Sequence, residues 1–165
     1  MKHSVTIATG LAAAVVAGLG LVCGLSGCAQ PVIESSACVD WVLFDSPADA
    51  AAEADGLVTG HVVQRSSPIR QYGVDVNVWT VEVDSWVIGS GDDEIHVASS
   101  PRTCESGSPY PDGDPLDTDE DVMIFIQELD GRMQTLTGFQ GVIPAPIDGN
   151  IPDAWLRAVA LSSLR

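Results

Sequence analysis

The sequence is poor in positive charge, and this scarcity excludes several kinds of partner. It has 7 Lys and Arg residues against 23 Asp and Glu residues, a formal net charge of −16 at pH 7. Its only lysine is Lys2, and no basic residue occurs between Cys28 and Arg65. A chain this acidic repels nucleic acid and anionic surfaces at long range. We therefore expect no nucleic-acid partner.

Recognisable catalytic motifs are also missing. The chain has no G-x-S-x-G elbow, no H-E-x-x-H pair, no phosphate-binding loop and no C-x-x-C motif. His61 and His96 stand alone in strand-like segments, where a structural role is expected rather than metal binding. Serines are present, but no spacing in the sequence groups one of them with a histidine and an acid. The prediction is that the protein is not an enzyme.

One long apolar run is present, and it lies at the N-terminus. Residues 5–22 carry no charge and follow Lys2 and His3, as in a secretory signal. The next residues, Leu25-Ser26-Gly27-Cys28, resemble the bacterial lipobox. The resemblance implies that the Cys28 thiol is alkylated by a diacylglycerol and that residues 1–27 are then removed. The alternatives are an ordinary signal peptide or an uncleaved anchor helix.

This reading fixes an expected location and organisation. Residues 28–37 form a tether that reaches roughly 35 Å at most, and residues 38–165 form a single β-rich domain. Loss of residues 1–27 leaves six arginines against 23 acids, a formal charge of −17. No polybasic patch assists anchoring, so the lipid on Cys28 must supply it, and two acyl chains suffice. The expected location is the extracytoplasmic face of the cell membrane.

Two cysteines remain beside the lipidated one. Cys38 and Cys104 would face an oxidising compartment, in which a disulfide is expected to form between them. In the loop-entropy model such a bridge is worth roughly 4 kcal/mol. The alternative is two free thiols.

The periodicity of the sequence predicts a mostly β fold. Residues 46–56 are typical of a helix, with Ser46 as its cap, Pro47 in its first turn and Gly56 as its end. The segments expected as strands are 57–64, 74–89, 94–100 and 122–129, an Asp-Gly turn at 130–132, and one or two strands within 133–144; a helix over 151–164 closes the chain. The fold class expected is a small antiparallel OB-like barrel or sandwich of about five strands with a helix at each end.

The order of these segments resembles a known family. The stretches "AEADGLVTGHVV", "VWTVEVDSWVIGSG", "EIHVASS", "DEDVMIFIQELDG" and "GFQGVIP" follow one another as the barrel strands do in netrin-like domains, including those of tissue inhibitors of metalloproteinases. The resemblance implies an OB-type five-stranded barrel and a disulfide-tethered N-terminal segment, which Cys38 would supply. It does not imply protease inhibition, because that activity needs a free N-terminal cysteine and Cys28 would carry lipid.

The densest polar segment is the stretch 101–121, which has no periodicity. Its acidic side chains are expected to form a solvated acidic loop, and the alternative is a calcium site at Asp112, Asp114, Asp117, Asp119 and Asp121. We expect this loop to be exposed, mobile and the surface that meets a cation or a basic protein partner. No cofactor is predicted beyond this calcium ion.

Four tryptophans offer a second candidate surface. Trp41, Trp79, Trp86 and Trp155 would form an exposed ligand platform if they gathered on one face, but tryptophans at such spacings usually pack in the core.

Together these observations predict a membrane-anchored lipoprotein that acts as a binding module. The alternatives are an enzyme or enzyme accessory of the cell envelope, and a passive envelope component.

Overall fold

The computed structural model describes residues 39–104 and 107–155. Within them the chain forms one short helix and eight strands, and no helix is long and apolar enough to cross a membrane. The elements in chain order are α1 (Pro47–Glu53), β1 (Gly56–Arg65), β2 (Ile69–Gln71), β3 (Val74–Val76), β4 (Val78–Ile88), β5 (Glu94–Ala98), β6 (Val122–Leu129), β7 (Arg132–Thr135) and β8 (Val142–Pro144). The mostly β class expected from the sequence is confirmed.

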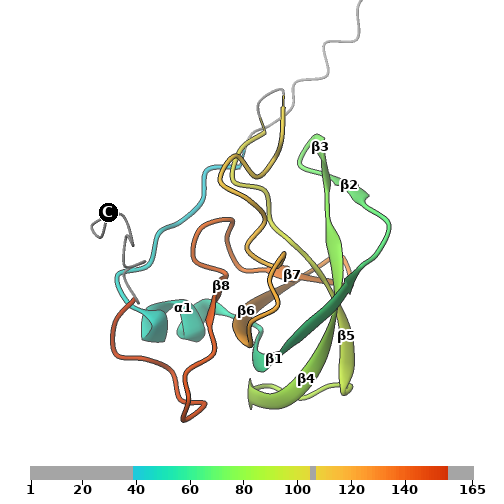
Figure 1. Cartoon of the computed structure of the whole chain (residues 1–165). Helices are drawn as coiled ribbons and strands as arrows, with labels where there is room; N and C mark the ends of the chain where they lie inside the picture. Colours follow the sequence, from blue (N-terminus) through green and yellow to red (C-terminus); the bar gives the residue numbers. More distant parts are fainter. Residues whose placement is uncertain (1–38, 105–106, 156–165) are drawn as a thin grey trace, which may run out of the picture. The chain divides into compact units, whose positions relative to one another are not determined.

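Five of these strands close into a barrel (Figure 1). Their order is β1-β4-β5-β7-β6, and β6 pairs again with β1. All pairs are antiparallel except β5 with β7, which run parallel. This closed arrangement is compatible with an OB-type barrel. The strand β8 extends the sheet beyond β6, and β2 and β3 form a separate hairpin.

The run 122–129 is apolar because its first five residues lie in the core. Residues Val122–Ile126 are buried on both faces of β6. Alternate side chains enter two clusters: Val122, Ile124 and Ile126 pack with the residues that fill one, and Met123 and Phe125 with Ala50 of α1 and its neighbours in the other. In a strand buried on both faces, the sequence does not alternate between apolar and polar residues. The prediction that this run is a central strand is confirmed.

The helix α1 has the expected start and an earlier end. The Ser46 side chain accepts a hydrogen bond from Asp49 N, the Asp49 side chain accepts one from Ser46 N, and Pro47 lies in the first turn. This reciprocal pair is a capping box, which a short sequence motif specifies locally. The helix stops at Glu53, and Gly56 is the first residue of β1 rather than the end of the helix.

The segment expected as one long strand, 74–89, is divided. β3 ends at Val76 and β4 begins at Val78, where the apolar phase of the sequence slips. β3 belongs to the hairpin with β2, a strand that the sequence did not predict. The side chain of the buried Gln134 ties this hairpin to the barrel through hydrogen bonds with Gln71 and Tyr72.

The closing helix is not seen where it was expected to begin. Residues 151–155 have no helical structure, and the rest of the predicted helix lies outside the described residues. Trp155 instead packs its ring 5.8 Å from that of Phe125 and donates its indole N–H to Phe44 O at 2.9 Å. The last described residues therefore run back against the segment that precedes α1.

Candidate functional site

The loop 101–121 is anchored to the barrel through Asp114. The Asp114 carboxylate accepts hydrogen bonds from Asn77 Nδ2 at 2.7 Å, Trp79 Nε1 at 2.9 Å and Ser99 Oγ at 2.6 Å, and from the backbone N–H of Leu116 at 3.0 Å. Four donors from three segments thus hold one side chain. The expectation of an exposed loop is wrong at Tyr110 and Leu116, which are buried, and Asp114 between them serves as an anchor.

Two apolar side chains reinforce this anchor. Leu116 is fully buried and packs in the cluster inside the barrel, and Tyr110 is 8% exposed. The Tyr110 hydroxyl donates to Ser99 O at 2.7 Å and accepts from Asn77 N at 3.1 Å. Burial raises the pKa of Tyr110 to about 12, and the nearby Asp114 charge adds to that shift. The loop therefore closes one side of the barrel instead of standing free.

The five aspartates proposed for calcium do not converge. Asp112 pairs with Arg102 at 3.3 Å, and Asp117 and Asp119 are exposed. The carboxylate of Asp114 accepts the hydrogen bonds that anchor the loop. Asp121 pairs with His61. Within residues 39–104 and 107–155, the one group of three or more metal-ligating side chains that lie together is His61, Asp84 and Asp121. Acid density along the loop thus does not produce a group of facing carboxylates.

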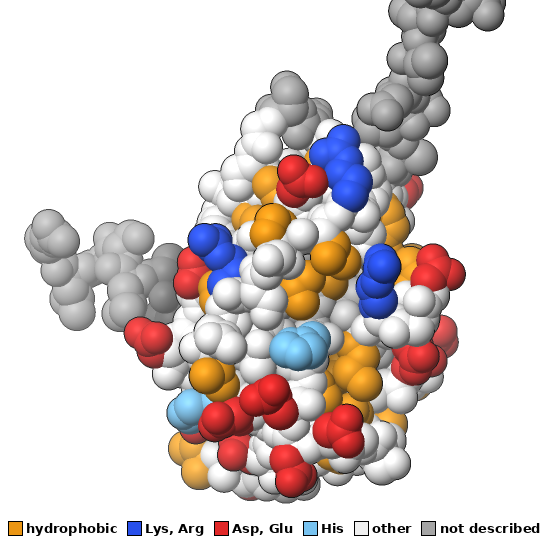
Figure 2. Space-filling model, turned by 90° about the vertical axis from the view of Figure 1, so that its right-hand side faces the viewer, with side chains coloured by type: hydrophobic (Ala, Val, Ile, Leu, Met, Phe, Trp, Pro, Cys, Tyr) orange, Lys and Arg blue, Asp and Glu red, His pale blue; other side chains and the backbone are white. Residues whose placement is uncertain are grey.

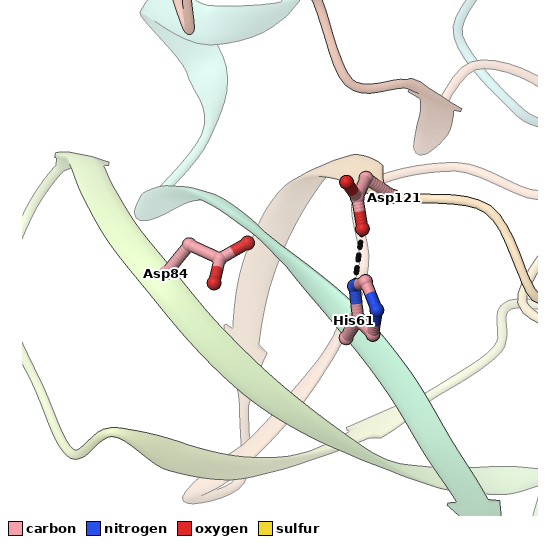
Figure 3. Close-up of side chains that lie close together, drawn as sticks. All are labelled: His61, Asp84 and Asp121. Atoms are coloured by element: carbon pink, nitrogen blue, oxygen red, sulfur yellow. Dashed lines mark ion pairs between the residues drawn. The ribbon is translucent and has the colours of Figure 1, made fainter.

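That group joins three neighbouring strands (Figure 3). His61 lies on β1, Asp84 on β4, and Asp121 directly before β6. β1 lies between the other two strands, because it pairs with both β4 and β6. One ligand atom from each side chain lies within 4.8 Å of the others, and all three residues are exposed. The imidazole is therefore flanked by a carboxylate on either side.

Local irregularities in β1 and β4 set this arrangement. The register pairs Thr59 with Ser85 and Gly60 with Val83, so Asp84 is an extra residue opposite no partner. Such a bulge re-aims the side chain of the extra residue. A Cβ on Gly60 would collide with the Glu82 carbonyl oxygen and lie 3.2 Å from Val83 Cα. The glycine thus permits β1 and β4 to approach closely beside His61.

A cleft lies on another part of the barrel, on the side of β5 (Figure 2). It has a volume of about 650 Å³. Ser66 follows β1, Ile69 begins β2, Val78 and Ile95 come from β4 and β5, and Arg132 begins β7. Figure 2 shows hydrophobic side chains in the middle of this face and acidic side chains gathered toward the bottom. The cleft combines an apolar floor with a charged rim.

The cleft opens where the sheet is incompletely paired. β5 pairs with β4 over Glu94–Ala98, but β7 covers only Val97 and Ala98. Along Glu94, Ile95 and His96, the second edge of β5 therefore has no partner strand within the described part of the chain. Val83 N donates to Asp93 O at 2.8 Å, so the main-chain groups of Asp93 point toward β4. In an antiparallel pair these groups point toward and away from the partner strand in alternate residues. The main-chain groups of Glu94 and His96 therefore point away from β4, toward the cleft.

His96 has its own partner in the cleft. Its Nδ1 lies 3.2 Å from the Thr80 hydroxyl, which lies 3.4 Å from the Ser66 hydroxyl. Thr80 is buried, whereas His96 is exposed. A carboxylate usually orients the histidine in hydrolytic triads. Here a threonine hydroxyl takes that position, so the geometry does not reproduce a triad.

The tryptophans do not form a platform. Trp79 is 7% exposed, Trp86 packs against the cluster inside the barrel, and Trp155 packs on the other side of the sheet. Each indole N–H donates to an acceptor within the protein: Trp41 to Pro101 O, Trp79 to Asp114, Trp86 to Asp92 O and Trp155 to Phe44 O. The four rings are thus structural and lie in different places.

Cys28 and Cys38, like the whole of the predicted signal and the predicted tether, lie outside the described residues. Cys104 is described, and Val39 N donates a hydrogen bond to its Sγ at 3.3 Å. The residue that follows Cys38 thus lies against the sulfur of Cys104. Trp41, which bonds to Pro101 O at 2.7 Å, keeps the same segment beside the start of the loop.

Sequence reasoning missed the cleft and the partners of His61. No signal in the sequence gives the parallel β5–β7 pairing that leaves the cleft open. The partners of His61 depend on pairing between distant segments and on a bulge. The glycine inside the strand-like run 57–64 was one usable signal, because a glycine in a strand often marks a bulge or a close backbone approach.

Comparison with known proteins gives no relative. The chain matches no family model, no curated protein and no solved structure.

Proposed function

We propose that the protein is a lipid-anchored binding module that takes an extended peptide of a partner protein into the cleft beside β5. The observation that carries this proposal is the open edge of β5 along Glu94–His96, next to a cleft of about 650 Å³. A peptide that adds a strand to an open edge gains affinity from main-chain hydrogen bonds, and pockets for its alternate side chains give specificity.

The lining of the cleft favours this occupant. Ile69, Val78 and Ile95 offer apolar contact, and the acids Asp92 and Glu94 outnumber the one arginine of the lining, Arg132. A peptide with alternating apolar and basic side chains complements both. Nucleic acid is disfavoured by the net charge of −16. The cleft is lined by no Trp, Tyr or Phe, and His96 is the one aromatic ring in its lining on which a base could stack.

Selection of peptides by the whole protein in detergent micelles tests this function. We expect display of random peptides to enrich segments with alternating apolar and basic residues. Bound peptide should slow amide hydrogen exchange at residues 94–98 and 131–133. Protection confined to another surface, such as residues 107–121, would contradict the proposal.

A matched pair of variants sharpens this test. Ser67 is exposed and lines the cleft, whereas Ser85 is exposed on β4 and does not. Ser67→Trp fills the cleft without disturbing the core, so it should lower peptide affinity at least tenfold. Ser85→Trp adds the same ring elsewhere and should leave affinity unchanged. Equal affinities for the two variants would count against the cleft.

Anchoring through Cys28 is the second part of the proposal. The lipobox at residues 25–28 supports it, and location at the extracytoplasmic face of the membrane follows from it. Cys28→Ala should abolish labelling by a fatty-acid analogue and leave a precursor that migrates more slowly. A mature protein whose N-terminus is unmodified and lies elsewhere would refute this assignment.

A disulfide between Cys38 and Cys104 is the third part. It is supported by the hydrogen bond from Val39 N to Cys104 Sγ, since that contact brings the neighbour of Cys38 to the sulfur. Intact mass after alkylation, with and without reductant, tests the bond. We expect no alkylation at these two positions before reduction, and alkylation of both would exclude the bridge.

Membership of the netrin-like group remains a proposal, supported by a strand order compatible with an OB-type barrel. The outward acids of the loop, Asp117, Asp119 and Glu120, offer a further surface for a cation or a basic protein. An enzyme or enzyme accessory is the alternative function. It would use the same cleft, whose lining includes the imidazole of His96.

A further inference from the structure

We propose that His61, Asp84 and Asp121 form a binding site for a divalent transition-metal ion, with Zn²⁺ as its natural probe. The site lies on the outer face of β4, β1 and the start of β6, and it does not depend on the peptide cleft. It goes beyond the function proposed above, because neither peptide binding nor lipid anchoring requires a metal.

The ligand set selects the class of ion. It offers one imidazole nitrogen and two carboxylate oxygens, whose ligand atoms lie within 4.8 Å of one another (Figure 3). Imidazole with carboxylates suits Zn²⁺ and Mn²⁺, whereas Ca²⁺ and Mg²⁺ prefer oxygen ligands alone. The ion would bind His61 Nδ1, the atom that now pairs with Asp121 Oδ1.

The site is largely built before the ion arrives. His61 and Asp121 are already in contact, and the bulge at Asp84 turns a third ligand toward them. No group of the described residues hydrogen-bonds to the Asp84 carboxylate, which is therefore free to move toward an ion. Zn²⁺ holds its nitrogen and oxygen ligands at about 2.0–2.2 Å, so exposed side chains within 4.8 Å need only small rotations.

The surrounding charge favours a cation. Glu82 is the β4 residue opposite His61 in the register, and it is exposed. It adds a third carboxylate beside the imidazole. The net charge of −16 also raises the local concentration of cations. Three protein ligands leave at least one coordination position for water or for a donor of a partner molecule.

Zinc titration of the whole, tag-free chain tests the site, with cysteine thiols blocked by alkylation. Isothermal calorimetry should detect one Zn²⁺ ion whose affinity falls at least tenfold in His61→Ala, Asp84→Asn and Asp121→Asn. Two matched variants are the controls, since His96 is the other described histidine and Asp119 is an exposed loop acid. His96→Ala and Asp119→Asn should bind as the wild type does, and an excess of Ca²⁺ should not compete.

A second measurement locates the ion without relying on affinity. Mn²⁺ added below stoichiometry to ¹⁵N-labelled protein should broaden amide signals at residues 60–62, 83–85 and 121–122. Circular dichroism should show that the variants keep their fold, because all three side chains are exposed. Broadening centred on residues 112–119, or wild-type affinity in His61→Ala, would overturn the proposal.

Discussion

Two acidic regions of this protein use their carboxylates in opposite ways. The six acids within residues 112–121 lie close together in the sequence, yet their carboxylates diverge: Asp114 turns inward, Asp117 and Asp119 face solvent, and Asp121 turns to His61. The group on β4, β1 and the start of β6 draws its members from positions 61, 84 and 121, and these converge. Proximity in the sequence and proximity in space are therefore separate properties here, and strand pairing supplies the second.

The largest effect should come from the inward carboxylate of the loop. Asp114→Ala leaves Asn77, Trp79 and Ser99 without the acceptor they share, and unsatisfied donors in a partly buried site are costly. We expect a loss on the order of 3 kcal/mol in the free energy of unfolding, measured by urea denaturation. Asp117→Ala, in the same loop but exposed, is the matched control and should cost under about 0.5 kcal/mol. Similar losses in both would mean that the loop is not anchored through Asp114.

The features that the sequence predicted correctly are those that a short segment determines by itself. Ser46, Pro47 and Asp49 specify the start of α1 through a capping box, and the run 122–129 contains enough apolar residues to define a buried strand. Asp130 and Gly131 both have positive φ values, 52° and 72°, as the two-residue hairpin turn requires. Each of these features depends on residues within a few positions of one another.

What the sequence did not predict depends on distant partners. The inward turn of Asp114 needs Asn77, Trp79 and Ser99 in place, and no pattern within the loop indicates it. The parallel contact of β5 with β7 and the extra residue at Asp84 arise from the register of whole strands. A hydrophobic pattern specifies which face a strand buries, but it leaves the choice of partner strand and the position of a bulge open.

A pH titration should reveal the buried tyrosine of the same loop. The pKa of Tyr110 is raised to about 12, from 10.0, so folding favours the neutral phenol. The contribution of Tyr110 to the free energy of unfolding is present in full below pH 10 and is lost as the pH rises to about 12. Two pKa units correspond to about 2–3 kcal/mol. Absorbance at 295 nm should show one late-ionising tyrosine, and Tyr110→Phe should remove that component.

The next effect concerns the close approach of β1 and β4. Gly60→Ala places a Cβ against the Glu82 carbonyl oxygen, so the two strands must separate. We expect a loss of about 2 kcal/mol in the free energy of unfolding, within the range for overpacked sites. The separation should also weaken zinc binding, because Asp84 would move away from His61. Unchanged stability in Gly60→Ala would show that the strands do not approach as closely as described.

The smallest effect should come from the outward acids of the loop. Asp117, Asp119 and Glu120 are exposed, and their contribution to folding is limited by solvent screening. The triple variant Asp117→Asn, Asp119→Asn and Glu120→Gln should change the free energy of unfolding by less than about 0.5 kcal/mol. It should also leave zinc affinity nearly unchanged, since none of the three belongs to the group around His61. A large loss of zinc affinity in the triple variant, measured by calorimetry beside Asp84→Asn, would mean that these three acids, and not the group around His61, hold the ion.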